Sequence, residues 1–230
     1  MRRGTALHHA AETLLRHKKE TGKELPQEEL SEIAVANLED NIDDGVQDID
    51  EDPTLSESKK IVQGLASGWS TYVAPTIGAI EGVEEYLTAK IEFDDGIFEV
   101  EGYLDLIDVN EETGEIRVRD WKTGKSYSPS TYENSLQLGM YTLLASANGF
   151  ESDLVRIDHL RALKSGVKHE SLELRRGSDH HLQIARIVQR IDQFTREGVF
   201  VPNPTSWTCN PGCDYWSSCP FRKPDVKEVE

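Results

Sequence analysis

Long apolar stretches are missing from this sequence of 230 residues. Because no run of about 18 apolar residues occurs, we predict no membrane-spanning helix. The first residues carry no apolar signal region, so we expect the protein to stay in the cytoplasm. With 37% hydrophobic residues, the chain can still bury one sizeable core.

Cysteine is scarce, and all three cysteines lie near the C-terminus: Cys209, Cys213 and Cys219. An odd number of cysteines in a chain expected in the reducing cytoplasm argues against a disulfide framework. The close spacing instead favours ligation of a metal ion or a cluster.

Basic residues are also few, with 25 Lys and Arg against 42 Asp and Glu, and the formal net charge is −17. This charge argues against tight, nonspecific binding of nucleic acid, although it leaves room for a local basic groove. Part of the charge is local, because residues 39–52 hold eight acidic side chains and no Lys or Arg. We predict an acidic loop over residues 39–54.

Periodicity and turn residues predict an α/β layout around a mixed sheet with helices on its flanks. Residues 1–200 form one predicted domain, and a Cys-containing tail over residues 201–230 is expected to pack on its core. Helices are predicted over residues 3–20, 24–38, 55–72, 128–148 and 179–197. Strands are predicted over residues 81–93, 97–109, 115–122, 153–163 and 168–174.

One strand of this layout ends in charged residues. Alternation over residues 115–122 places Val118, Asp120 and Lys122 on one face and Arg119 and Trp121 on the other. Burying a charge costs several kcal/mol, on the order of the known desolvation penalties, unless the charge is paired or bound to a metal. The preceding strand can bring the carboxylate of Asp105 to the same end. Two carboxylates and a lysine at one sheet edge suit a divalent metal ion and a phosphate.

Other motifs are weak when taken singly. An acidic residue two positions before a lysine also occurs at Glu57 and Asp225, where a surface role is expected. Gln137 and Tyr141 are one helical turn apart and share a face, yet a tyrosine packed in the core explains this pair equally well. His8, alone on a helix, is also weak support for a site.

Taken together, these motifs resemble the PD-(D/E)XK nuclease superfamily, in its RecB-like branch that includes the CRISPR-associated iron–sulfur exonucleases. The motifs occur in the family's order, and the resemblance runs from Gly4 to Cys219. They are Gly4-Thr-Ala-Leu-His8, Gly102-Tyr-Leu-Asp105, Asp120-Trp-Lys-Thr-Gly124 and Gln137-Leu-Gly-Met-Tyr141. The resemblance implies a restriction-endonuclease-like core and a DNA exonuclease of recombination, repair or phage DNA metabolism, with a helicase or recombination partner.

The resemblance also implies roles for the site residues. His8, Asp105, Asp120 and the backbone carbonyl of Trp121 would bind Mg²⁺ or Mn²⁺, which prefer hard oxygen ligands. Lys122 would orient or activate the attacking water. Gln137 and Tyr141 would support the site and the DNA backbone, of single strands or of duplex ends. The product would carry a 5′-phosphate.

Family members with a 4Fe–4S cluster use three C-terminal cysteines and a fourth before the first helix. Cys209, Cys213 and Cys219 match the first three, but the sequence has no other cysteine. A start site assigned too late, a degenerate cluster or a ligand of another kind would explain the difference. Zinc held by three cysteines and a histidine, or three buried thiols, are alternatives.

Two further functions stay open at this point. The first is a non-catalytic DNA-binding or scaffold module of a helicase–nuclease system, favoured by the acidic charge and the missing cysteine. The second is an iron–sulfur or zinc protein in which the cysteine tail is the active part and the acidic pair is structural.

Overall fold

The structure, a computed structural model, describes residues 2–23, 26–43, 54–94, 96–199, 209 and 213–219. The chain divides into two compact units, Met1–Val188 and Gln189–Glu230. The first unit holds the sheet and the helices around it. The second holds the last turns of α6 (Ser178–Arg196) and the short helix η3 (Trp216–Ser218). Most of the tail that we predict to pack on the core lies outside the described residues.

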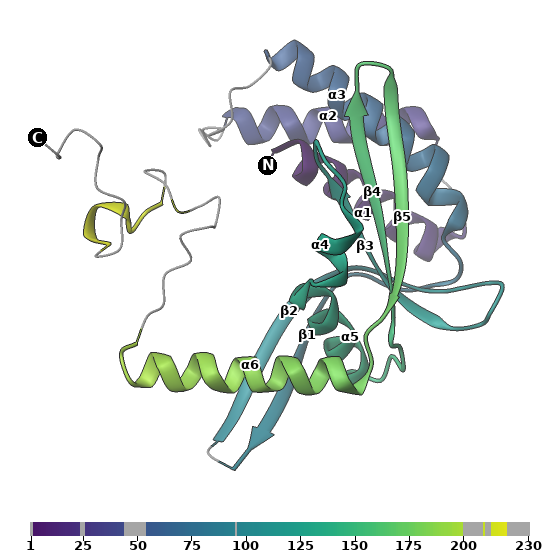
Figure 1. The fold of residues 1–230 in the computed structure, drawn as a ribbon. Helices are drawn as coiled ribbons and strands as arrows, with labels where there is room; N and C mark the ends of the chain where they lie inside the picture. The colour runs from purple at the N-terminus through teal and green to yellow at the C-terminus, as the bar shows by residue number, and fades with distance from the viewer. Residues whose placement is uncertain are drawn as a thin grey trace, which may run out of the picture. The chain divides into compact units, whose positions relative to one another are not determined.

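A five-stranded mixed sheet forms the centre of the first unit (Figure 1). Its order follows the chain, and every neighbouring pair is antiparallel except the parallel pair β3–β4. The parallel pair requires a crossover, which the helices between β3 and β4 provide. The strands are β1 (Ile80–Phe93), β2 (Gly96–Val109), β3 (Ile116–Thr123), β4 (Leu154–Leu163) and β5 (Gly166–Arg175).

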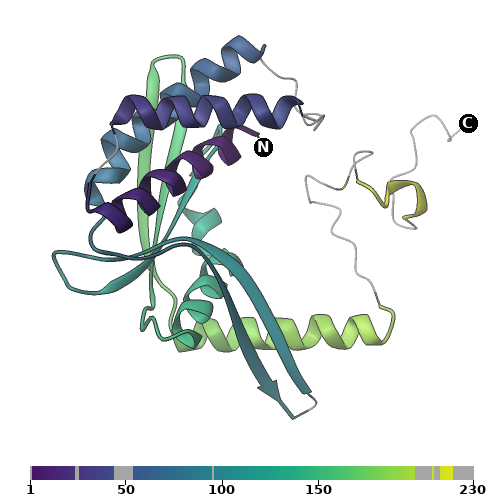
Figure 2. The same ribbon diagram turned by 180° about the vertical axis from the view of Figure 1, so that it is seen from behind.

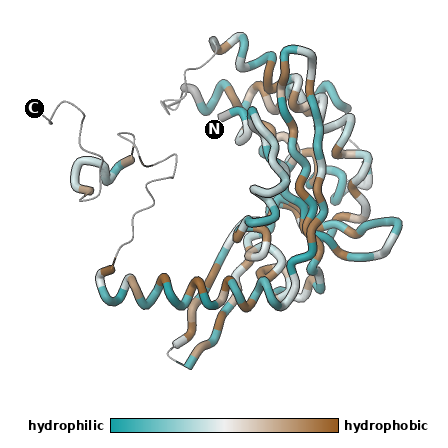
Figure 3. Tube along the Cα trace, viewed as in Figure 1, coloured by the Kyte–Doolittle hydropathy of each residue, from teal (hydrophilic) through white to brown (hydrophobic). Residues whose placement is uncertain are grey.

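Three N-terminal helices cover one face of the sheet (Figure 2). They are α1 (Arg2–Thr21), α2 (Gln27–Asp43) and α3 (Leu55–Gly68). Their buried residues, among them Leu7, Leu30 and Val62, form one core cluster with Leu106 and Trp121 of the sheet. Apolar positions also recur along the strands themselves (Figure 3). This packing fixes α1 against the strand that carries Asp120.

The opposite face is covered by the crossover helices, where the structure corrects the sequence prediction. One helix was expected over residues 128–148, but α4 (Pro129–Glu133) and α5 (Leu136–Ala147) are separate. Ser135 has an extended backbone, and the side-chain amide of Asn134 donates a hydrogen bond to the Ser130 carbonyl. These local bonds compete with helix continuation. The α5 residues Leu138, Tyr141 and Leu144 build a second core cluster with Val118 of β3.

Two boundaries also differ from the prediction. Helix α2 runs to Asp43, so the predicted acidic loop begins later than residue 39, and residues 44–53 lie outside the described part of the chain. Helix α3 ends at Gly68 and continues as a π-helix, η1 (Trp69–Val73), and a short 3-10 helix, η2 (Ala74–Thr76). Trp69 of η1 is fully buried, and its ring meets the Trp121 ring edge-on at 5.7 Å.

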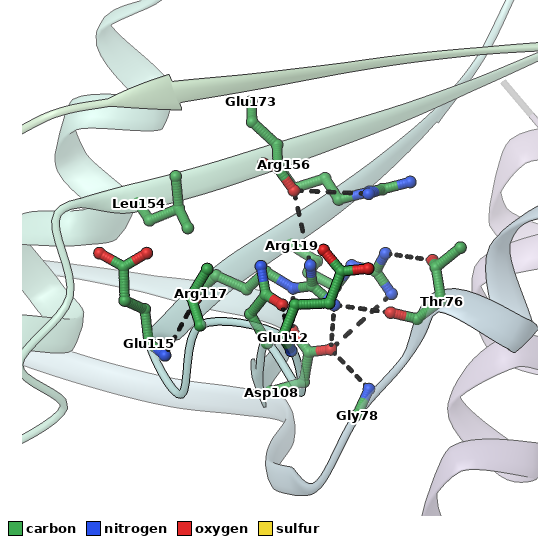
Figure 4. A network of polar contacts seen from close by, with 12 residues as sticks. Thr76, Gly78, Asp108, Glu112, Glu115, Arg117, Arg119, Leu154, Arg156 and Glu173 are labelled. Atoms are coloured by element: carbon green, nitrogen blue, oxygen red, sulfur yellow. Dashed lines mark hydrogen bonds and ion pairs between the residues drawn. The ribbon is translucent and has the colours of Figure 1, made fainter.

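A network of buried charges joins β2 and β3 to the segment before β1 (Figure 4). Arg117 donates to both carboxylate oxygens of Asp108, at 2.8 and 2.9 Å, and to the Thr76 carbonyl at 2.6 Å. Arg119 donates to the Thr76 hydroxyl at 2.6 Å, and the Gly78 amide donates to Asp108 at 3.0 Å. Both arginines alternate with Val118 and Asp120, as the strand pattern predicts, so this network and Asp120 lie on opposite faces.

Among the described residues, no helix combines the length and apolar character that a membrane span requires.

Candidate metal and phosphodiester site

The site is built at the end of β3, where α1 crosses the strand. A side chain at Gly4 would place its Cβ 2.9 Å from the Thr123 hydroxyl oxygen, so glycine at this position allows a close approach of α1. One turn later, the His8 ring lies 5.8 Å from the Trp121 ring. Gly4 of the motif Gly4-Thr-Ala-Leu-His8 therefore allows α1 to pack closely on the end of β3, and this packing positions His8.

His8 faces two of the groups that the sequence predicts for a metal site, and one further carboxylate. Its Nε2 atom lies 2.8 Å from the backbone carbonyl oxygen of Trp121, and its Nδ1 atom lies 3.5 Å from a carboxylate oxygen of Asp105. The carboxylate of Glu84 lies 3.9 Å from the same Nδ1 atom. The ligand atoms of His8, Glu84 and Asp105 are close enough together to hold one metal ion.

The two carboxylates of the motif differ in their bonding. Asp105 is 6% exposed and accepts a hydrogen bond of 3.0 Å from the Trp121 amide, which ties β2 to β3. Asp120 is fully buried and accepts a 2.8 Å hydrogen bond from the Lys122 ammonium on one oxygen. Its other oxygen has no hydrogen-bond partner in the described part of the chain. A buried carboxylate oxygen without a partner is costly, and a cation would offset that cost.

The electrostatics of the site follow from this surplus of carboxylates. Burial raises the pKa of Asp120 to about 7, and the nearby charge of Asp105 adds to the shift. Burial alone would lower the pKa of His8, but Asp105 and Glu84 outweigh burial and raise it to about 10. Without a cation, these side chains therefore hold extra protons near neutral pH. Groups that hold protons in this way release them when a metal ion binds.

Gln137 and Tyr141 lie on α5, which covers the face of the sheet that carries Asp120. The Gln137 amide donates a 2.6 Å hydrogen bond to the Tyr141 hydroxyl. Burial raises the pKa of Tyr141, and the charges of Asp120 and Asp105 add to that shift, so the phenol lies near both carboxylates. Tyr141 is also part of the α5 core cluster, as the core interpretation expected. It packs in the core and presents its hydroxyl to the site.

Glu84 lies near His8 but belongs to none of the sequence motifs. It lies on β1 between Val83 and Glu85, which pair with Leu106 and Leu104 on either side of Asp105. Its φ angle is 46°, the only positive value for a non-glycine residue within the described ranges. Such backbone strain is uncommon and gathers at functional sites. The sequence offers no signal for Glu84, because it is one acidic residue in an acidic chain.

The three cysteines differ from the His8 site in their arrangement. Cys209, Cys213 and Cys219 are all free and half-buried. Within the described ranges, they do not form a group of metal ligands like that of His8, Glu84 and Asp105. The iron–sulfur cluster therefore stays a prediction.

Comparison with known proteins identifies the family. The family model of the PD-(D/E)XK nuclease superfamily matches residues 1–220. The chain resembles the crystal structure of SSO0001, with 15% identity, 95% of this chain and 85% of that chain covered, and a TM-score of 0.48. It also resembles a "putative exonuclease" from Eubacterium rectale, with 10% identity, 95% and 77% covered, and a TM-score of 0.49. No curated protein matches the sequence. From the family match, we conclude that this chain belongs to the PD-(D/E)XK nuclease superfamily, whose members hydrolyse phosphodiester bonds and generally use divalent metal ions.

Proposed function

We propose that this protein is a DNA exonuclease that requires Mg²⁺ or Mn²⁺. Two observations carry the proposal. The buried carboxylate of Asp105 lies 3.5 Å from His8 Nδ1, and the charges of both groups act on the buried carboxylate of Asp120 at the end of β3. Asp120 is bonded to Lys122 on one oxygen, and its other oxygen has no partner among the described residues. The donor set consists of oxygen atoms and one imidazole, which suits Mg²⁺ and Mn²⁺.

In this proposal, Asp105, Asp120, the Trp121 carbonyl and the imidazole of His8 would hold the metal ion. A divalent ion held there would supply a water molecule of lowered pKa and positive charge for the attacking and leaving oxygens of an in-line displacement. Glu84, whose carboxylate lies 3.9 Å from His8 Nδ1, would orient the imidazole of His8 by its charge. Carboxylates commonly orient metal-binding histidines in this way.

Lys122 acts on the water and on the phosphate. Its ammonium is held by Asp120 at 2.8 Å and is partly open to solvent, with 33% of its side chain exposed. It can therefore orient the attacking water and offset negative charge on the phosphate. The Tyr141 oxygen already accepts a hydrogen from Gln137, so the hydrogen of the Tyr141 hydroxyl is available for a phosphate oxygen.

The test is degradation of labelled single-stranded DNA in Mn²⁺ and in EDTA. Wild type should degrade linear DNA in Mn²⁺ but not in EDTA, and Lys122→Met should degrade it much more slowly. Lys60→Met, on an exposed lysine of α3, is the matched control and should behave like wild type. A closed circular strand of the same sequence separates the two modes of attack. An exonuclease leaves the circle intact, whereas cutting of the circle would contradict the proposal.

Activity that persists in EDTA, or equal activity of Lys122→Met and wild type, would also contradict it. The recombination or repair context, a helicase partner and the iron–sulfur cluster stay predictions that this assay does not address.

A further inference from the structure

Three aromatic rings gather beside Lys122, and none of them belongs to the family motifs quoted above. Tyr127 lies in the loop after β3, Tyr132 on α4 and His159 on β4. The ring centroids are 5.6 Å apart for Tyr127 and His159, 5.7 Å for the two tyrosines and 6.0 Å for Tyr132 and His159. We call these three residues the aromatic cluster.

The aromatic cluster lies on the same face of the sheet as Asp120. His159 is the partner of Lys122 in the parallel ladder of β3 and β4, and residues opposite each other in a ladder point to the same face. Burial raises the pKa of Tyr132 to about 12, and the charge of Asp120 contributes to that shift. The aromatic cluster and the proposed catalytic groups are therefore neighbours.

Hydrogen bonding holds the inner part of the aromatic cluster in place. His159 is 4% exposed, and its Nδ1 atom is hydrogen-bonded to the Tyr132 hydroxyl. Its Nε2 atom is buried and has no hydrogen-bond partner among the described residues. The Tyr127 ring meets His159 edge-on, at an interplanar angle of 80°, and Tyr127 is only half-buried. Tyr132 and His159 are thus held in place, and they support the Tyr127 ring, which is partly open to solvent.

Positive charge lies beside the His159 ring, whereas Glu170 and Glu133 lie near Tyr127. Burial lowers the pKa of His159, and the charges of Arg161 and Lys122 lower it further, so both cations lie near the imidazole. Arg161 is paired with Glu170 at 2.8 Å, and Lys122 with Asp120. Single-stranded DNA is bound by aromatic rings that stack on its bases and by cations that contact its phosphates, and the aromatic cluster with Lys122 and Arg161 provides groups of both kinds.

We propose that Tyr127, supported by Tyr132 and His159, stacks on one base of single-stranded DNA next to the phosphate to be cleaved, with Lys122 and Arg161 beside the backbone of that nucleotide. The proposal rests on the proposed nuclease function and names its substrate as a single strand. In a duplex, each base is paired and stacked within the helix and is not available to the Tyr127 ring.

The experiment measures binding of fluorescent oligonucleotides to Asp120→Asn protein, which retains the aromatic cluster and should not degrade them. One probe is a short oligothymidylate, and the other is an abasic strand with the same number of phosphates. Tyr127→Leu in this background should weaken binding of the oligothymidylate about 10-fold, the usual size of a stacking loss. It should leave binding of the abasic strand unchanged, and Tyr127→Phe should bind both probes like the parent protein.

Tyr72 provides a matched control. Its ring is 45% exposed and stacks on His169 at 5.7 Å. His169 contacts Asp158, which follows the partner of Asp120 in the ladder and therefore points to the opposite face. Tyr72→Leu removes a comparable tyrosine–histidine contact and should not change binding of either probe.

The outcomes separate the two proposals. Equal losses on both probes, no loss on either, or a blunt duplex bound as tightly as the single strand with the same dependence on Tyr127, would overturn the stacking subsite. If wild type degrades DNA and any of these results is found, only the subsite fails. If wild type neither degrades nor binds DNA, the nuclease proposal fails and the subsite fails with it.

Discussion

Asp120 and Asp158 lie on neighbouring strands, on opposite faces of one sheet, and both are fully buried. Asp158 is surrounded by basic side chains, with His169 at 2.8 Å, Arg156 at 3.1 Å and Arg119 at 3.4 Å. Asp120 is bonded to Lys122 alone on one oxygen, and its second oxygen has no hydrogen-bond partner in the described part of the chain.

The pKa values of these two carboxyl groups shift in opposite directions. Burial would raise both, but His169, Arg119 and Arg156 outweigh burial at Asp158 and hold its pKa below the usual range. At Asp120, burial and the charge of Asp105 prevail and raise the pKa to about 7. The difference comes from the neighbours, since the exposure of the two side chains is the same.

The two carboxyl groups thus belong to two kinds of polar network, one structural and one that we propose to be functional. The network around Asp158 pairs its charges within the protein and so tolerates burial. The groups around Asp120 stay incompletely paired within the described part of the chain, which lowers stability and supports the metal site that we propose. Sites with such perturbed groups are frequent where chemistry takes place.

The largest expected effect is on catalysis. Asp120→Ala should reduce DNA cleavage by about 1,000-fold or more, because a metal ligand that contributes several kcal/mol to transition-state stabilisation is lost. Asp158→Asn should leave the rate of the folded protein within about 10-fold of wild type. Single-turnover cleavage at a temperature where both variants are folded measures the difference. A similar loss in both variants would remove the distinction between the two faces.

The next effect is on stability. Asp158→Asn should lower the free energy of unfolding by about 3 to 5 kcal/mol at pH 7, because it leaves the buried guanidinium of Arg119 without its nearest carboxylate. The pKa of Asp158 is depressed in the folded state, so its contribution is present above the unfolded pKa and is lost as the pH falls through the folded pKa. Denaturant unfolding at pH 7 and at about pH 3 measures both statements. An undiminished loss at the lower pH would contradict the second.

The effect of Asp120→Asn on the free energy of unfolding should have the opposite sign to that of Asp158→Asn. In metal-free protein at pH 8, it should raise the free energy of unfolding by about 2 to 4 kcal/mol, because the ionised carboxylate is costly when its folded pKa is about 7. The folded state then holds the proton more tightly than the unfolded chain between about pH 4 and pH 7. Wild type therefore loses stability as the pH rises through that window, and the gain from Asp120→Asn should vanish near pH 4. Unfolding curves in EDTA at both pH values provide the measurement.

The smallest effect concerns Glu84. Glu84→Gln should weaken Mn²⁺ binding about 10- to 100-fold, as expected for a group that orients a metal-binding histidine. Glu85→Gln, at the adjacent position of β1, is the matched control and should bind Mn²⁺ like wild type. Direct titration of Mn²⁺ into each protein gives the affinities. Equal weakening in both variants would indicate a general charge effect and not a role for Glu84 at His8.

Much of this arrangement could be predicted from the sequence. The alternation of β3 was sufficient to place Asp120 and Arg119 on opposite faces, and the ordered motifs indicated the family over nearly the whole chain. These features depend on local periodicity and on short spacings. The ends of the strands were likewise predicted to within about two residues.

Other features depend on contacts between distant segments. The partners of Arg119, Thr76 and Asp158, are far from it in sequence, so the buried network could not be read from β3 alone. Glu84 adopts a left-handed backbone conformation. A sequence signals that conformation only where a glycine stands, so the position of Glu84 could not be predicted. The break between α4 and α5 results from local hydrogen bonds of Asn134, which the apolar period does not reveal.

The most direct test is calorimetric titration of Mn²⁺ into metal-free wild type at about pH 7.5, repeated in buffers of different ionisation enthalpy. His8, with a pKa of about 10, and Asp120, with a pKa of about 7, hold protons that the ion must displace. We therefore expect binding accompanied by release of about one proton or more, and both should be lost in an Asp105→Asn, Asp120→Asn double variant. Binding of equal strength in the double variant, or the absence of binding in wild type, would contradict a metal site at this end of β3.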